Sequence, residues 1–207
     1  LNFVSVDLQR TDQQYITSSN GDVYDTLFSI ENVIGSGSAD SITGSAANNR
    51  LEGSQGDDIL DGAGGDDVLD GGDGFDIAFF TFATSGVVAD LRISGPQNTI
   101  GSGADTLVSI EGLFGSLYDD VLTGDDGDNR LEGGWGNDVL VGGAGDDLLV
   151  GGPDSDTMTG GAGKDTFRDR PEWFNGSTIT DFSAGDKLVF VEVDPATFMF
   201  SLSGSTL

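Results

Sequence analysis

The segment from Gly115 to Arg168 repeats a nine-residue pattern six times without interruption. Cut every nine residues, it reads GSLYDDVLT, GDDGDNRLE, GGWGNDVLV, GGAGDDLLV, GGPDSDTMT and GGAGKDTFR. The first position is always Gly, the sixth is Asp or Asn, and the eighth is Leu, Met or Phe. Self-similarity at a short fixed period indicates a solenoid, in which each unit buries its apolar side chains only against its neighbours.

Each unit divides into a turn and a short strand. A triplet such as Val139-Leu140-Val141 suits a strand, with the eighth position facing one way and its neighbours the other. The six residues before it turn the chain, and Gly supplies backbone angles that a Cβ forbids. Two nine-residue units (9 + 9 = 18) therefore complete one coil, and residues 18 apart are expected to stack.

A shorter block of the same pattern spans residues 35–79. Its five units are GSGSADSIT, GSAANNRLE, GSQGDDILD, GAGGDDVLD and GGDGFDIAF. Stacking every second unit places the sixth positions of the two blocks in four columns, namely Asp40, Asp58 and Asp76; Asn49 and Asp67; Asp120, Asp138 and Asp156; Asn129, Asp147 and Asp165.

Stacked carboxylates need a counter-charge. Adjacent coils of a parallel sheet lie roughly 4.8 Å apart, and carboxylates at that spacing cannot all stay ionised unaided. Calcium takes about six to eight oxygens from carboxylates and backbone carbonyls. We therefore expect calcium between stacked turns, with all eleven sixth-position residues as ligands and the neutral Asn49 and Asn129 giving weaker sites. The pairs number three in the first block and four in the second, up to seven ions: 40/58, 58/76, 49/67, 120/138, 138/156, 129/147 and 147/165.

The repeat resembles that of the RTX family, the hemolysin-type calcium-binding nonapeptide repeat proteins. The likeness extends over roughly residues 32–190, because Ser177–Phe190 is similar to the I-x-D-F-x-x-G-x-D segment that follows the repeats in many RTX proteins. The resemblance implies an all-β fold, a right-handed parallel β-roll or β-helix solenoid in two tandem repeat blocks with β-rich caps. It also implies the C-terminal repeat region of a protein exported by type I secretion machinery to the cell surface or the medium.

The two blocks belong to a tandem duplication. The sequence NRLEG at positions 49–53 recurs at positions 129–133, and Ser29-Ile30-Glu31 recurs as Ser109-Ile110-Glu111. Within the second linking segment, Asp105 fits the sixth position of an isolated unit and is a further predicted calcium ligand. We divide the chain into a strand-rich N-terminal cap (1–34), a first calcium-binding block (35–79), a strand-rich connector (80–114), a second calcium-binding block (115–168) and a C-terminal cap (169–207). One continuous rod and two separate rods are both open.

Charge and composition exclude several classes of function. Eight basic and 36 acidic residues give a net charge of −28, whose self-repulsion opposes compaction. With 34 glycines to order, the metal-free chain is expected to be largely disordered and to fold on binding calcium. Such a polyanion will not hold nucleic acid or an anionic membrane by charge. No apolar run reaches the roughly 18 residues of a membrane span.

The absence of Cys and His excludes disulfides, zinc sites of the usual kind and His-based catalysis. No catalytic residue is predicted, because Tyr15, Tyr24 and Tyr118 form no recognisable constellation. The chain starts at Leu1 with neither an initiator Met nor a signal peptide, so we expect a fragment of a larger protein. We expect a module that folds on calcium outside the cell and supports the secretion and stability of that protein.

The alternative is a calcium-dependent polysaccharide-binding or adhesin module attached to an enzyme such as an alginate epimerase, a lipase or a serralysin-type protease. An exposed Trp135 could stack on a sugar ring, although packing against a neighbouring turn is favoured. Arg50 and Arg130 could touch an anionic polymer, although salt bridges to acidic neighbours are favoured. The fifth-position residues Asp57, Asp66 and Asp146 are expected to face solvent.

Overall fold

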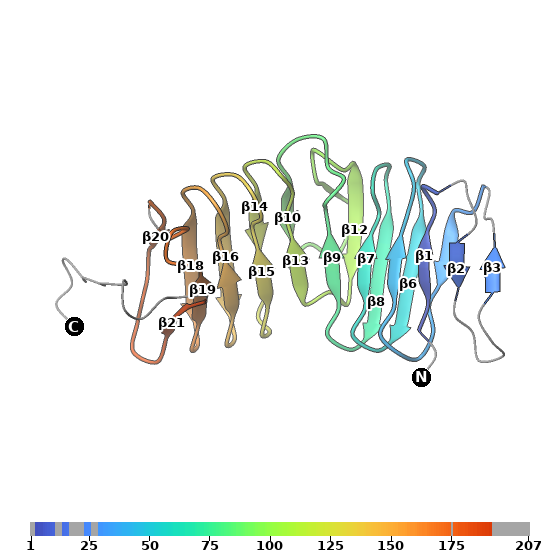
Figure 1. Ribbon diagram of the computed structural model, residues 1–207. Coiled ribbons are helices and arrows are strands. Elements are labelled where there is room, and N and C mark those ends of the chain that lie inside the picture. Colours follow the sequence, from blue (N-terminus) through green and yellow to red (C-terminus); the bar gives the residue numbers. More distant parts are fainter. Residues whose placement is uncertain (1–2, 11–13, 17–22, 26–28, 175, 192–207) are drawn as a thin grey trace.

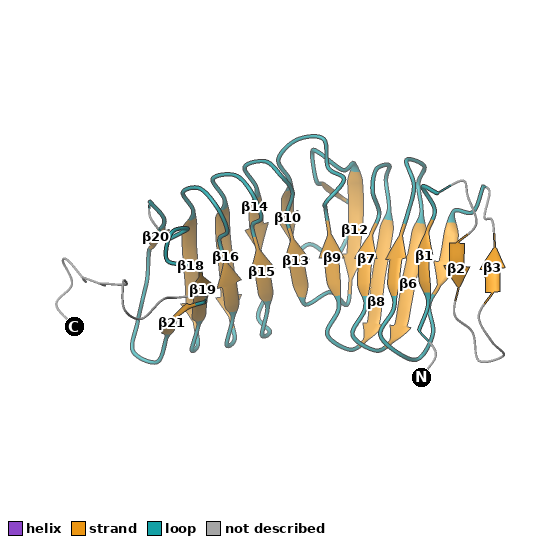
Figure 2. Ribbon diagram, viewed as in Figure 1, coloured by secondary structure: helices purple, strands orange, loops and turns teal. Residues whose placement is uncertain are grey.

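The protein is an all-β rod built from stacked coils (Figure 1). The computed structural model describes residues 3–10, 14–16, 23–25, 29–174 and 176–191, and the statements below concern these residues. Strands and turns account for all of them, without a helix (Figure 2). The prediction of a parallel β-solenoid of the β-roll type is therefore confirmed.

Twenty-one short strands form the solenoid and its ends. The strands up to the end of the first block are β1 (Ser5–Asp7), β2 (Gln14–Ile16), β3 (Val23–Asp25), β4 (Asn32–Ile34), β5 (Ser41–Thr43), β6 (Arg50–Gln55), β7 (Ile59–Asp61), β8 (Val68–Asp73) and β9 (Ile77–Phe79). The linking segment holds β10 (Val88–Asp90), β11 (Gln97–Asn98), β12 (Ala104–Val108) and β13 (Gly112–Phe114). The remaining strands are β14 (Val121–Thr123), β15 (Arg130–Glu132), β16 (Val139–Ala144), β17 (Leu148–Val150), β18 (Thr157–Ala162), β19 (Thr166–Asp169), β20 (Thr178–Ile179) and β21 (Lys187–Phe190).

One side of the solenoid is a single sheet that runs through both repeat blocks. Its order is β1-β5-β7-β9-β13-β15-β17-β19-β21. The other side is divided into two sheets of five strands, β4-β6-β8-β12-β11 and β10-β14-β16-β18-β20. Strands β2 and β3 pair separately as an antiparallel ribbon. Within the three larger sheets every pairing of described strands is parallel except that of β11 with β12.

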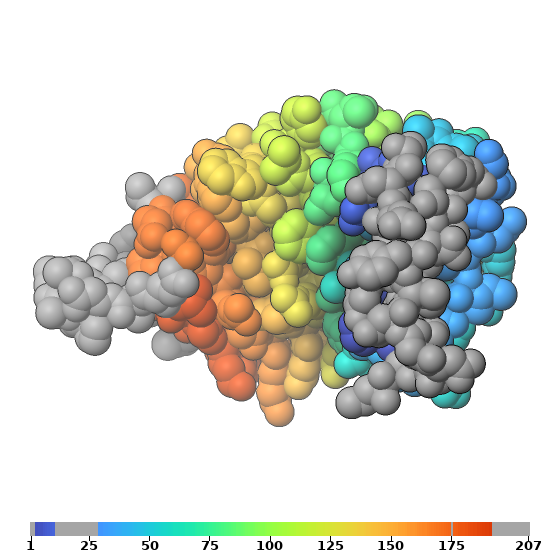
Figure 3. All heavy atoms as spheres, turned by 45° about the vertical axis from the view of Figure 1, so that its right-hand side comes forward, coloured from blue at the N-terminus to red at the C-terminus, as the bar shows by residue number. Residues whose placement is uncertain are grey.

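The strand register follows the predicted interval within each block. Leu122 of β14 lies opposite Leu140 of β16, and Leu140 lies opposite Met158 of β18, so each step equals two repeat units. Space-filling atoms coloured by sequence form successive bands across the body for the same reason (Figure 3). Every second unit therefore stacks, as the nine-residue repeat predicts.

The two blocks form one continuous solenoid. Ala78 of β9 lies opposite Leu113 of β13, and the rings of Phe79 and Phe114 stack at 4.7 Å on the outer face. On the other side Leu69 of β8 lies opposite Leu107 of β12. At the junction, the paired strands on both sides are therefore separated by more residues than the two repeat units of the regular step. The additional residues form β10 and β11, which lie between β12 and β14 and divide that side into two sheets.

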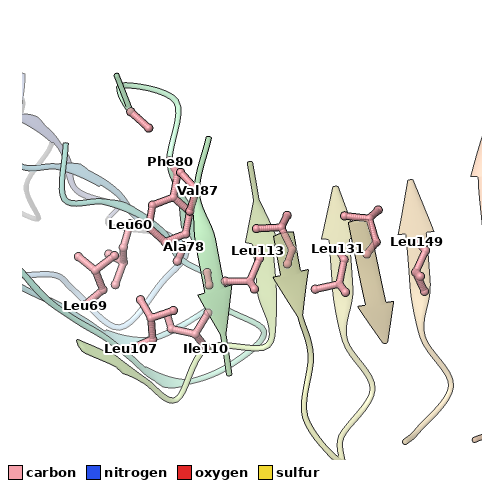
Figure 4. Close-up of a cluster of buried hydrophobic side chains, with 14 of the residues drawn as sticks. Leu60, Leu69, Ala78, Phe80, Val87, Leu107, Ile110, Leu113, Leu131 and Leu149 are labelled. Atoms are coloured by element: carbon pink, nitrogen blue, oxygen red, sulfur yellow. The ribbon is translucent and has the colours of Figure 1, made fainter. Parts of the chain in front are cut away.

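The core is a row of buried apolar side chains, formed by the eighth positions of the repeats and continued by Leu113 in the linking segment. Leu113, Leu131 and Leu149 project from successive strands into the centre of the coil (Figure 4), and all three are fully buried. Burying each such side chain contributes about 1.5–3 kcal/mol. Where the register is interrupted, Phe80 and Val87 continue the core. In the described part of the chain there is no helix with the length and apolarity to cross a membrane.

Candidate metal sites

The predicted ligands lie on both sides of the solenoid where a turn passes into a strand, and all but Asp105, the second residue of β12, directly precede their strand. Asp138, for example, precedes β16, and Asp147 precedes β17 on the opposite side. Every predicted ligand is buried, with at most 4% of its surface exposed. The set comprises Asp40, Asn49, Asp58, Asp67, Asp76, Asp105, Asp120, Asn129, Asp138, Asp147, Asp156 and Asp165.

Backbone-to-side-chain hydrogen bonds join these residues into ladders. The amide of Asp120 donates to Oδ1 of Asp138 over 2.8 Å, and the amide of Asp138 donates to Oδ1 of Asp156 over 3.0 Å. The same bond links the pairs 40/58, 49/67, 58/76, 129/147 and 147/165. It also links Asp67 to Asp105 across the longer step, so Asp105 occupies a regular position in its ladder. The structure thus brings together all the predicted pairs.

These turns fall into two groups, according to whether the second-position amide donates a hydrogen bond to the sixth-position side chain. In four turns the second-position residue donates its amide to the sixth-position side chain and closes the turn, as Ser116 does to Asp120 and Asp125 does to Asn129; the other two are Ser36 to Asp40 and Ser45 to Asn49. In the other turns of the two repeat blocks the second position has positive φ, as at Gly134 (102°) and even Ala63 (67°). Positive φ favours Gly, and these turns stay open toward the carboxylate.

The open turns contain carboxylate oxygens without a hydrogen-bond partner. Within the described residues, five buried Oδ2 atoms have none, and they belong to Asp58, Asp67, Asp76, Asp138 and Asp147. Leaving a buried acceptor unpaired costs free energy. The first-position glycines explain where these atoms point, because a Cβ at Gly133 would overlap both Oδ2 of Asp138 and the carbonyl oxygen of Gly151. Absence of a side chain therefore leaves a cradle lined by oxygens from two successive turns.

The metal-free ladders shift the pKa values of their carboxyl groups upward. Burial, the largest cause, raises the pKa of Asp138 to about 8 and that of Asp67 to about 7. For Asp138 the neighbouring Asp120 and Asp156 carboxylates add to the increase. Burial likewise raises the pKa of Asp58, Asp147 and Asp156 to about 6. These side chains resist ionisation unless a positive charge joins them.

Calcium fits this donor set. The described residues contain no group of three or more acidic side chains that could hold a metal by themselves. An ion in a gap such as that between Asp138 and Asp156 must therefore take most of its oxygens from the backbone. Calcium accepts mixed carboxylate and carbonyl coordination, whereas zinc prefers His and Cys ligands. The unpartnered Oδ2 atoms and the glycine cradles meet that requirement.

Fifth-position residues form a second, outer ladder that sequence reasoning did not predict. The amide of Asn137 donates to Oδ1 of Asp119, and the amide of Lys164 donates to Oδ1 of Asp146. Asp57, Asp66 and Asp146 are exposed, as predicted. Inner-ladder amides donate to a side chain of the following coil, while outer-ladder amides donate to one of the preceding coil. Hydrogen bonds therefore connect each turn to both the following and the preceding coil.

Two further acidic residues extend the inner ladders beyond the predicted set. The amide of Asp76 donates to Oε2 of Glu111 over 2.8 Å, and the amide of Asp165 donates to Oδ1 of Asp186 over 3.1 Å. Both occupy the position directly before a strand, β13 and β21. The duplicated Ser-Ile-Glu triplet and the I-x-D-F-x-x-G-x-D segment were the sequence signals for them.

The arginine side chains that could contact a polymer ligand form salt bridges, whereas the tryptophan is exposed. Arg50 forms salt bridges with Glu52 and Asp70, and Arg130 pairs with Glu132, as favoured from the sequence. Trp135 is 59% exposed, so the favoured packing against a neighbouring turn leaves most of it in solvent. The side chains of Tyr15 and Tyr24, and the predicted cap beyond residue 191, lie outside the described part of the structure.

A parallel β-solenoid with buried carboxylates at every turn and oxygen-lined glycine cradles between turns defines a class of calcium-binding repeat proteins. The family model described as RTX calcium-binding nonapeptide repeat (4 copies) matches residues 43–78, 113–140 and 132–167. Both blocks of this chain therefore carry RTX calcium-binding nonapeptide repeats. A comparison with curated proteins gave no match.

Proposed function

We propose that this chain is a calcium-dependent folding module of a larger secreted protein. The observation that carries the proposal is the set of five buried, unpartnered aspartate oxygens in the open turns. A stable metal-free fold would have to tolerate these oxygens together with a net charge of −28. Calcium removes both costs at once, so binding and folding become one process.

In each gap some groups would bind the ion, and others fix the distance between the two coils. In the gap between Asp138 and Asp156, Oδ2 of Asp138 and the carbonyl oxygen of Gly151 would hold calcium. The ion supplies the positive charge that keeps the carboxylates ionised. Meanwhile the Asp138 amide holds Oδ1 of Asp156, which fixes the spacing of the two turns. The corresponding gaps 58/76, 67/105 and 147/165 offer the same unpartnered oxygen.

Calcium availability would then restrict folding to one side of the membrane. Extracellular calcium modules bind with dissociation constants on the order of 10⁻⁴–10⁻³ M. At low cytosolic calcium the chain stays unfolded and competent for type I export, and outside the cell mass action drives folding. The match to RTX repeats supports this sequence of events.

We also propose that the module itself is not an enzyme. Carboxyl groups with strongly raised pKa values are often catalytic, but here the five with the largest values all belong to the inner ladders. Their position supports a structural role for these carboxyl groups in preference to a role in proton transfer.

A second candidate function is the binding of an extracellular polysaccharide in calcium. A groove of about 460 Å³ is lined mainly by apolar groups, including Phe114, Leu117, Trp135, Pro153 and Trp173. Aromatic faces of this kind can stack on sugar rings. A glycan array probed in calcium tests the idea, with Trp135→Ala as the comparison. Binding that Trp135→Ala abolishes supports it, and no binding by the folded wild type refutes it.

The folding proposal is tested by far-UV circular dichroism in chelator, in magnesium and in millimolar calcium. The expected result is a largely disordered spectrum in chelator and in magnesium, and a β spectrum in calcium. Magnesium should fail because it demands near-ideal octahedral geometry and dehydrates reluctantly. Identical β spectra under all three conditions would refute the proposal.

A further inference from the structure

One of the five unpartnered oxygens lies where the first repeat block ends. Oδ2 of Asp76 is buried without a hydrogen-bond partner, and Asp76 itself is fully buried. By the regular step of two units, the next turn on this side would lead into a strand near residue 95, but no strand of this sheet begins there. The turn that stacks on Asp76 is instead residues 109–111, which lead directly into β13.

This short turn reproduces the geometry of a regular gap. In the regular gap 58/76, a Cβ at Gly53 would overlap Oδ2 of Asp58 and the carbonyl oxygen of Gly71. At the junction, a Cβ at Gly71 would overlap Oδ2 of Asp76 and the carbonyl oxygen of Ser109. Ser109 therefore provides its carbonyl oxygen where a repeat provides that of its first glycine.

Glu111 replaces the aspartate of the following turn. Its Oε2 accepts the amide of Asp76 over 2.8 Å, as Oδ1 of Asp76 accepts the amide of Asp58 over 2.8 Å. The backbone is also paired, because the amides of Glu111 and Gly112 both donate to the carbonyl oxygen of Asp76. All the oxygens that characterise a regular gap thus recur at the junction.

The shorter turn accounts for the longer side chain. Only positions 109–111 connect β12 to β13, whereas six positions precede the strand triplet in each repeat. Ser109 adopts φ +48°, an uncommon value for a residue other than Gly. Left-handed backbone at Ser109 reverses the chain within this small space, and the additional methylene of Glu111 lets a carboxylate reach the Asp76 amide. A strained residue that persists at such a point is a reason to look for function.

We infer that Asp76, Ser109 and Glu111 form an additional calcium site that joins the two repeat blocks into one rod. Glu111 and Ser109 lie outside every segment matched by the family model, and the nine-residue pattern does not include them. The inference rests on the proposed calcium-dependent folding. It adds that the junction is itself held by an ion, so that the two blocks fold together.

The first test counts bound ions. Native mass spectrometry in calcium is applied to the wild-type chain, to Glu111→Gln and to Glu31→Gln. Gln keeps the size of Glu and can still accept the Asp76 amide, but it removes the charge. Glu31 is the matched control, because it belongs to the duplicated Ser-Ile-Glu triplet but is exposed, and β4 after it is the edge strand of its sheet. We expect Glu111→Gln to bind one ion fewer and Glu31→Gln to match the wild type.

The second test measures whether the blocks fold together. Both tryptophans, Trp135 and Trp173, come after the junction, so their fluorescence reports the second half of the rod while circular dichroism reports both halves. The two calcium titrations should coincide in the wild type. In Glu111→Gln they should separate, with one midpoint higher by on the order of tenfold, because the charge of a ligand set tunes calcium affinity.

The outcomes distinguish the inference from the function on which it rests. A wild-type chain that binds no calcium overturns the proposed function. A wild type that binds calcium, with a Glu111→Gln variant that has the same ion count and coincident titrations, overturns the junction site alone. If Glu111→Gln is unfolded in millimolar calcium, recovery at higher calcium supports a lost ligand, and failure to recover at any concentration shows a purely structural role and contradicts the site.

Discussion

The side-chain amide of Asn129 donates a hydrogen bond to the backbone carbonyl oxygen of Glu111 over 3.2 Å. In the first copy Asn49 faces the carbonyl oxygen of Glu31 in the same way, at the longer distance of 3.5 Å. A carboxylate has no hydrogen to donate. The two asparagines that depart from the repeat therefore each stack on a Ser-Ile-Glu turn. Each adds a second donor to the glutamate carbonyl oxygen, which also accepts the backbone amide of Arg130 or Arg50.

Asn129→Asp should destabilise the calcium-loaded protein even though it restores the repeat consensus. The new carboxylate would face the Glu111 carbonyl oxygen and lose one of the two hydrogen bonds that this oxygen accepts, at a cost of about 0.5–1.5 kcal/mol. Asn49→Asp should have a smaller effect, because its bond is longer. Thermal unfolding in saturating calcium measures both. A higher melting temperature for Asn129→Asp would show instead that the site needs charge more than it needs a donor.

Filling a glycine cradle should remove an ion. In Gly133→Ala the Cβ would overlap Oδ2 of Asp138 and the carbonyl oxygen of Gly151, so we expect one calcium fewer and a loss of about 1–3 kcal/mol from overpacking. Gly64→Ala is the control, because a Cβ there meets no atom within 4 Å. Calorimetric titration and thermal unfolding report the two effects. Equal ion counts in both variants would argue against the cradle as the binding position.

The inner and outer ladders should differ in their response to loss of charge. Asp138→Asn retains an oxygen for the Asp120 amide but removes the charge beside the cradle, so calcium affinity should fall about tenfold or more. Asp119→Asn keeps the exposed outer bond to Asn137 and should leave the affinity unchanged. Calcium titrations of the two variants, followed by circular dichroism, make the comparison. Equal losses would assign calcium binding to surface charge in general.

Metal-free stability should decrease as pH rises. Burial raises the pKa of Asp138 to about 8 and that of Asp67 to about 7, from an ordinary value of 3.8. The folded metal-free chain therefore binds more protons than the unfolded chain, and it loses stability as pH rises from about 4 through about 8. In chelator, β structure should be greater at pH 5 than at pH 8.

Calcium affinity should follow pH in the opposite sense, because the ligands must be ionised. The calcium concentration at the midpoint of folding should decrease as pH rises from 6 to 8. Binding at pH 6.5 should release protons into a weakly buffered solution. A midpoint independent of pH would mean that the raised pKa values of the metal-free ladders have no part in binding.

The nine-residue register was sufficient to predict most of the solenoid. It required Leu122, Leu140 and Met158 to stack at steps of two units, because each strand can bury its central side chain only against the next coil. It also placed every sixth-position residue in a buried ladder, including Asp105 in its isolated unit. Local periodicity determines these features, so they can be read without a structure.

The register could not predict the junction, because residues 80–114 do not follow it. The direct pairing of β9 with β13, and the place of Glu111 in the ladder, depend on contacts across a step that no repeat unit sets. Nor could it separate closed turns from open ones, since Ser54 and Ala63 adopt positive φ where Ser45 donates to Asn49 instead. That difference is set by the backbone of each turn and by the coil stacked on it.

The most direct test of the central claim is anomalous diffraction from a crystal grown in calcium. Ion density is expected beside each unpartnered oxygen, in the gaps 58/76, 67/105, 76/111, 138/156 and 147/165. Empty gaps in a folded crystal grown at millimolar calcium, with those aspartate oxygens hydrogen-bonded to water, would contradict it.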